Sequence, residues 1–229
     1  MKKRMKIIAI GLAVIAVIGF AIYWNHPAHI YSREISQLRK IYSSENQNGL
    51  SVIIERNATD GDWGKLERAV KDYVKNRTES LATLEEIKAD DELTTALDAD
   101  KLRANSPDFS NILTKLKNTK ITLESAREKF DKVQSIDEAV NQFGSDLNDE
   151  FKTRYREELE KDFAVEDSRI NNADAFKMLQ GMVDTYIAEL ELLAKNPKAW
   201  NVDSGVLKIT DRSIKKQYDA ILEDVKKIQ

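Results

Sequence analysis

The chain has two histidines, His26 and His29, and their close spacing is the first arrangement that could do chemistry. Two imidazoles can bind a transition metal, but Pro27 lies between them and a stable site needs further ligands. With no third histidine, the region beyond them cannot form a Ser-His-Asp triad. The absence of cysteine excludes disulfides, thiolate catalysis and Cys-ligated zinc. We interpret the two histidines as part of an ordinary polar segment.

A second candidate is the stretch Asp60–Gly64, whose acidic residues and glycines suggest the start of a calcium-binding loop. An EF-hand loop needs glycine at its sixth position and glutamate at its twelfth. Counting from Asp60, these positions hold Lys65 and Lys71, so the pattern fails. The stretch is better explained as a turn in which Asp60 or Asp62 caps the following helix.

Neighbouring carboxylates are the third candidate, and they occur at 85–86, 90–92 and 157–158. A glycosidase needs two carboxyl groups that face each other across a cleft, whereas adjacent residues on a helix point in different directions. We therefore interpret these groups as solvated helix faces. The sequence indicates no catalytic residue, no cofactor-binding residue and no metal ligand, although carboxylates from distant positions could still converge.

The N-terminus carries the strongest pattern in the chain. Residues 1–6 contain four cations and no anion, and residues 7–24 form an apolar run that ends in Tyr23 and Trp24. At about 1.5 Å per residue a helix of this length spans roughly 27 Å, enough to cross a bilayer core. The run is longer than a signal-peptide core and no small-x-small cleavage site follows it, so we expect an uncleaved anchor, with a cleaved signal peptide as the alternative.

The basic tip also predicts the orientation. Because cations near a span favour the cytoplasmic side, we expect a cytoplasmic N-terminus and an extracytoplasmic remainder. The predicted organisation is a basic tip at 1–6, a transmembrane anchor at 7–24, a juxtamembrane stalk at 25–60 and a helical domain at 61–229. The formal net charge is −3 and there is no later block of Lys and Arg, so nucleic-acid binding is not expected.

The rest of the chain has a helix-rich composition, because charged residues make up 33% and only 8 glycines and 3 prolines interrupt it. Apolar residues recur every three or four positions over 63–87, 109–133 and 173–193. After Asn196 and Pro197 the period changes to alternation around Gly205, which predicts a small β-hairpin. The expected fold is all-α: a single N-terminal transmembrane helix, then an extracytoplasmic bundle of about five helices with one hairpin near the C-terminus.

Several local features can be predicted more closely. The stretch Asn105–Asp108 has the pattern of one helix ending and the next starting, with Ser106 as the cap and Pro107 at the first helical position. Ser135–Glu138 fits a capping box. Leu123 and Phe143 are expected to be buried. Arg77 interrupts an apolar stripe, so it is either a residue at the edge of the bundle with its charge in water or a buried charge that needs a carboxylate partner. We favour the edge.

These patterns favour a non-enzymatic, membrane-tethered binding or scaffold protein that acts through helix surfaces or a groove between helices. Its expected partners are the membrane, through the single span, and a protein or peptide. Two alternatives stay open: a membrane-anchored, cell-wall-active hydrolase that uses carboxylates, and an immunity or sensor protein for a peptide.

Overall fold

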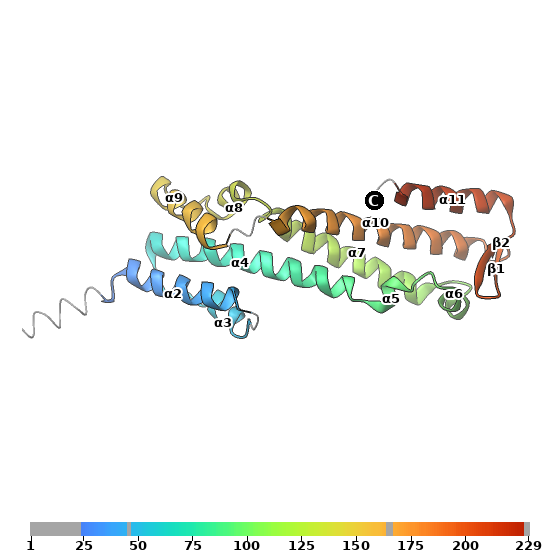
Figure 1. Ribbon diagram of the computed structural model, residues 1–229, viewed down its shortest axis with the longest axis horizontal. Coiled ribbons are helices and arrows are strands. Elements are labelled where there is room, and N and C mark those ends of the chain that lie inside the picture. The colour runs from blue at the N-terminus through green and yellow to red at the C-terminus, as the bar shows by residue number, and fades with distance from the viewer. Residues whose placement is uncertain (1–23, 45–46, 164–166, 227–229) are drawn as a thin grey trace, which may run out of the picture. The chain divides into compact units, whose positions relative to one another are not determined.

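The computed structural model describes residues 24–44, 47–163 and 167–226, and this part of the chain is mostly helical (Figure 1). The predicted basic tip at 1–6 and all of the predicted anchor except Trp24 lie outside the described residues. Within them, no helix combines the length and apolarity that a membrane crossing needs.

The described chain forms two compact units, and each unit is built from two separate stretches of sequence. Unit 1 contains the described residues of Met1–Lys75 and Ser135–Ala164, and unit 2 contains those of Asn76–Gln134 and Val165–Gln229. Helix α4 (Gly61–Lys88) runs from one unit into the other.

Unit 1 contains the first part of α4 and a set of shorter helices. These are α2 (Pro27–Tyr42), α3 (Leu50–Glu55), α8 (Ile136–Phe143), α9 (Asp149–Glu158) and the π-helical turn η1 (Leu159–Phe163). The core of this unit is rich in aromatic rings. Trp63 on α4 contacts both Tyr31 on α2 and Phe151 on α9, with ring centroids 5.2 and 5.0 Å apart. The buried hydroxyl of Tyr155 donates a hydrogen bond of 3.0 Å to the carbonyl oxygen of Ala69.

A buried charge cluster, formed by Glu34, Glu67 and Lys71 and covered by the more exposed Arg56, joins α2 and α4 to the chain between them. The ammonium of Lys71 lies 2.8 Å from a carboxylate oxygen of Glu34 and 2.6 Å from one of Glu67. It also donates to the carbonyl oxygen of Arg56 at 2.7 Å, while the guanidinium of Arg56 donates to Glu34. Burial raises the pKa of Glu34, but hydrogen bonds from Arg56 and Lys71 outweigh it and hold that pKa below its ordinary value.

Glu67 also fixes the turn before α4. Its carboxylate accepts hydrogen bonds from the backbone N–H of Ala58 at 2.9 Å and of Thr59 at 2.8 Å. Gly64 completes this turn, since a Cβ there would lie 2.5 Å from the carbonyl oxygen of Thr59. Helix α4 begins at Gly61, as the Asp60–Asp62 pattern predicts.

Unit 2 contains the end of α4 and two long helices that pack on each other. Its further elements are α5 (Asp91–Thr94), α6 (Ala99–Asn105), α7 (Ser110–Asp131), α10 (Asp167–Lys195), strands β1 (Trp200–Asp203) and β2 (Val206–Ile209), and α11 (Arg212–Lys226). Helix α10 packs against both α7 and α11 (Figure 1). The core between α7 and α10 includes Phe130 and Phe176, whose ring centroids lie 5.3 Å apart.

The predicted hairpin is confirmed: β1 and β2 pair antiparallel, with Trp200 opposite Ile209 and Asp203 opposite Val206. Trp200 stacks on Phe109 at 5.6 Å and donates its indole N–H to the carbonyl oxygen of Leu193 at 3.0 Å. A two-stranded hairpin is marginal alone, and these contacts hold it against the end of α10.

Of the other local predictions, some are confirmed and some are wrong. The capping box is confirmed, because the Ser135 hydroxyl accepts from the Glu138 N–H at 3.1 Å, and Leu123 is fully buried. Phe143 is only half-buried, since it is the last residue of α8. The helix start at Ser106–Pro107 is wrong: Ser106 follows α6, and α7 begins at Ser110 because buried Phe109 turns the chain.

Arg77 is 2% exposed, so the favoured position at the edge of the bundle is wrong and the alternative, a buried side chain, is the one found. The helices are more numerous than the five expected, because short segments such as α3, α5 and α6 are helical as well.

Candidate functional site

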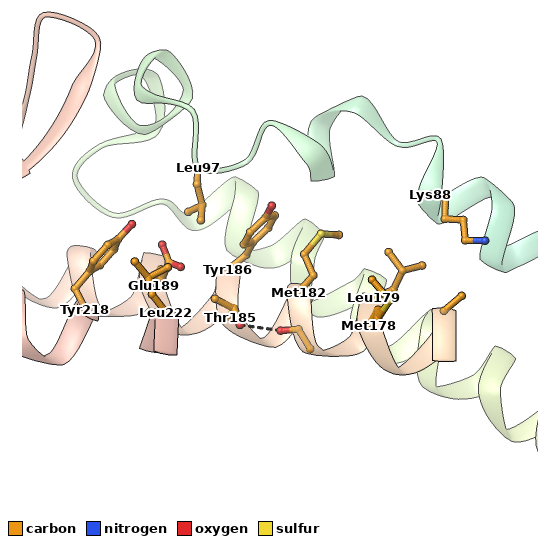
Figure 2. Close-up of a pocket in the computed structure, with 12 residues that line it drawn as sticks. Lys88, Leu97, Met178, Leu179, Met182, Thr185, Tyr186, Glu189, Tyr218 and Leu222 are labelled. Atoms are coloured by element: carbon orange, nitrogen blue, oxygen red, sulfur yellow. Dashed lines mark hydrogen bonds between the residues drawn. The ribbon is translucent and has the colours of Figure 1, made fainter. Parts of the chain in front are cut away.

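Unit 2 contains an apolar groove of about 510 Å³ between α10, α11 and the end of α4 (Figure 2). The residues that line it are Lys88, Leu97, Ala175, Met178, Leu179, Gly181, Met182, Thr185, Tyr186, Glu189, Tyr218 and Leu222. Binding sites for small molecules commonly have volumes of roughly 300–1,000 Å³ and mostly apolar walls. The groove has the size and character of a ligand site.

Helix α10 supplies most of the groove because it has two apolar faces. Phe176, Val183 and Leu190 recur at seven-residue steps and are buried in the core of unit 2. Met178 and Met182, four residues apart, lie on the groove face, and Met178 is 52% exposed. When the apolar stripe of a helix is wider than its contact with the core, part of the stripe stays on the surface, where another molecule can cover it.

Helix α11 covers this face only loosely. Asp211 caps it by accepting hydrogen bonds from the N–H groups of Ser213 and Ile214 at 2.8 and 3.0 Å. Over 212–223, where its side chains are described, none is fully buried. Tyr218 is half-buried and Leu222 is exposed, so the wall formed by α11 retains apolar surface in contact with solvent.

Glu189 is the acidic residue that lines the groove. Glu189 is 1% exposed, and among the described residues neither of its carboxylate oxygens accepts a hydrogen bond of acceptable geometry. Burial raises the pKa of Glu189, and an interaction with the Tyr218 hydroxyl lowers it by a smaller amount. The same pairing, together with burial, raises the pKa of Tyr218. A buried carboxyl with so little compensation is a feature of binding and catalytic sites.

Two other polar side chains of the groove, Thr185 and Lys88, have partners. The Thr185 hydroxyl donates to the carbonyl oxygen of Gly181 at 2.8 Å, the dashed line in Figure 2. Lys88 lies at the opposite end of the groove from Glu189 and Tyr218 (Figure 2), and its ammonium pairs with Glu85 at 2.8 Å. The groove therefore combines a long apolar wall with one uncompensated carboxyl group, an arrangement suited to binding.

The two histidines take a structural position at the start of α2. His26 caps this helix, and its Nδ1 accepts from the Ala28 N–H at 3.3 Å. The His29 ring lies edge-on to it at 6.0 Å between centroids. Over the described part of the chain, no three side chains of the His, Cys, Asp or Glu type are grouped so that they could hold a metal ion.

Each carboxylate run has at least one member that pairs with a lysine or arginine. Asp90 and Glu92 both bind the ammonium of Lys115, at 2.9 Å for Asp90. Glu158 pairs with Arg39 at 3.3 Å. Glu158 and Glu157 also line a polar cavity of about 410 Å³ in unit 1 that Trp63, Arg154 and Lys161 share.

The sequence favours a groove between helices but does not predict its lining, because the apolar stripe over 173–193 describes one face of α10 and the groove lies on the other. A signal existed: apart from Met1 and Met5, the methionines of the chain are Met178 and Met182, and both line the groove. Comparisons of the chain with protein-family models, with curated proteins and with solved structures found no match.

Proposed function

We propose that this chain is a non-enzymatic, membrane-tethered binding protein whose groove between α10 and α11 takes an apolar segment of a protein or peptide partner. The observation that carries this proposal is the apolar groove, with exposed Met178 and Leu222 at its walls. A sensor or immunity protein for a peptide would use the same surface.

Three properties of the groove favour a peptide segment. Its volume matches a few side chains rather than a whole domain. Methionine side chains are unbranched and polarisable, so surfaces that contain them adapt to different apolar sequences. Helix-in-groove recognition is a common mode of peptide binding, and it needs an apolar channel between helices.

The tether is proposed from the sequence, namely the apolar run at 7–24 behind the basic residues at 1–6. If the helical part is extracytoplasmic, protease added to intact cells should degrade it while a cytoplasmic control protein survives. Mass spectrometry should then recover a protected N-terminal fragment that includes the apolar run. Survival of the full-length chain on intact cells, with degradation after lysis, would contradict the orientation.

Site-specific photocrosslinking in intact cells tests the groove. A p-benzoylphenylalanine in place of Met178 should crosslink to a partner, and the crosslinked partner peptide should map to an apolar segment. The matched control is the same photoprobe in place of Ile121, an equally large side chain of unit 2 that is 64% exposed on α7, outside the groove. Equal adducts at the two positions would refute a specific role for the groove.

A further inference from the structure

We infer that the segment bound in the groove carries one basic side chain, lysine or arginine, whose cation pairs with Glu189. This inference rests on the proposed function and gives the chemistry of its ligand. It depends on the buried carboxylate, on the aromatic side chains around it and on the apolar wall that leads to it.

Among the described residues that line the groove, none pairs a positive charge with the carboxylate of Glu189. A carboxylate withdrawn from water is stabilised when it gains a cation, gains hydrogen-bond donors or takes up a proton. Lys88 is the cationic side chain among the lining residues, but it lies at the far end of the groove and is paired with Glu85 (Figure 2). An incoming cation is the complement that this end of the groove lacks.

Two tyrosines flank the carboxylate. Tyr186, Glu189 and Tyr218 all line the same part of the groove (Figure 2). Burial raises the pKa of both tyrosines, and the negative charge of Glu189 raises both further. Aromatic faces attract ammonium and guanidinium groups, most strongly where water is excluded. Glu189, Tyr186 and Tyr218 therefore form an anionic, aromatic end wall that favours an organic cation.

The apolar wall selects the kind of cation. Calcium and magnesium need several oxygen ligands, whereas the groove offers one carboxylate. A lysine or arginine side chain has an apolar stem and a charged head, so its stem can lie along Met182 while its head reaches Glu189. Apolar neighbours in the same segment would then cover Met178 and Leu179.

The test uses the full chain in phosphatidylcholine nanodiscs, whose neutral surface does not attract cationic peptides. The probes are short, end-capped fluorescent peptides in which one lysine is flanked by leucine, isoleucine or phenylalanine. Each has a partner peptide in which acetyl-lysine, which lacks the charge, replaces the lysine. For the best-bound pair we expect the lysine form to bind at least about tenfold more tightly, since it alone completes the buried ion pair.

Two variants locate the effect. Glu189→Gln should reduce the preference for the lysine peptide over the acetyl-lysine peptide to under about twofold, because Gln keeps the shape and removes the charge. Lys88→Gln, a control at the other end of the groove, should keep the preference. Retained preference in Glu189→Gln would overturn the assignment to this carboxylate.

The outcomes separate this inference from the proposed function. Equal binding of both peptides to the unmodified chain overturns the requirement for a cation but keeps the peptide groove. Binding of neither peptide, across all flanking sequences, overturns the peptide groove itself. If no peptide binds and dodecylamine does, the occupant is a small amphiphilic amine and the inference about a protein segment is wrong.

Discussion

Replacing Lys71 with methionine is expected to lower the stability of unit 1 by about 3 to 5 kcal/mol, the range for breaking a buried ion pair from one side. The ammonium of Lys71 lies within 2.8 Å of carboxylate oxygens on both Glu34 and Glu67. Without it, Glu34 keeps Arg56 as a partner, but Glu67 loses its only charge contact among the ion pairs found in the described chain. Methionine preserves the stem, so the loss measures the charge.

Hydrogen exchange of the full chain, followed by mass spectrometry of peptides, measures this effect in place. Peptides from α2, α3 and the first part of α4 should exchange faster in Lys71→Met. The control is Lys65→Met on the same helix, because Lys65 is 45% exposed and pairs with exposed Asp62 at 3.2 Å. Such surface pairs contribute at most about 1 kcal/mol. If the two variants differ by less than about 1 kcal/mol, the cluster is not a main stabilising element of unit 1.

The long elements could be predicted from the sequence because each depends on local periodicity. The stripe over 63–87 gives α4, and the change of period after Asn196 marks the hairpin. Capping residues such as Ser135 and Asp211 act within three positions of themselves, so they are visible in the sequence. Helix ends set by tertiary packing, such as the turn at Phe109, are not visible there.

The buried charge cluster shows what periodicity cannot predict. Lys71 and Glu34 are 37 positions apart, and each taken alone is a charged residue typical of a solvated helix face. The segment 25–60, predicted as a stalk, contains Glu34 and the buried residues Ile35 and Leu38, so part of it packs in unit 1. Long-range pairing of charges follows from the fold and cannot be inferred from a single charged position.

The groove, like the charge cluster, forms from segments that only the fold brings together. Its walls come from α4, the chain at Leu97, α10 and α11, which are widely separated in sequence. In the sequence Glu189 is one of many charged residues of its helix, and its neighbours Ile187, Ala188 and Leu190 do not set it apart. Tyr186 is a neighbour on the same helix, but only the packing of α11 beside α10 brings Tyr218 and Leu222 to the same groove.

Replacing Glu189 with leucine is expected to raise the stability of unit 2 by about 1 to 3 kcal/mol at neutral pH, the range for removing a buried polar group without a partner. The folded state holds the pKa of this carboxyl above its ordinary value of 4.5. At a pH between 4.5 and the raised pKa, the carboxyl is protonated in the folded state and ionised in the unfolded state, so unfolding releases a proton. The stability of the unmodified chain therefore falls as the pH rises through that window. The gain from leucine should be largest above this window and smallest below 4.5.

Hydrogen exchange of peptides from α10 and α11, at about pH 4 and about pH 7.5, checks both the sign and its pH dependence. The matched control is Glu191→Leu, because Glu191 lies two residues away on α10 and its carboxylate pairs with Lys117 at 2.7 Å. That contact lowers the pKa of Glu191, so its replacement should leave stability unchanged or reduce it by up to about 1 kcal/mol. A loss of stability in Glu189→Leu at neutral pH would show that the carboxylate already has a partner within the fold.

A stabilising replacement at Glu189 would also bear on function. Residues that weaken a fold are commonly found where binding or catalysis requires them, because an apolar side chain would serve the core better. If Glu189→Leu both stabilises unit 2 and removes the preference for lysine peptides, the carboxylate is present for its ligand. If it stabilises unit 2 and leaves that preference intact, Glu189 weakens the fold without contributing to recognition, and the cation must bind elsewhere.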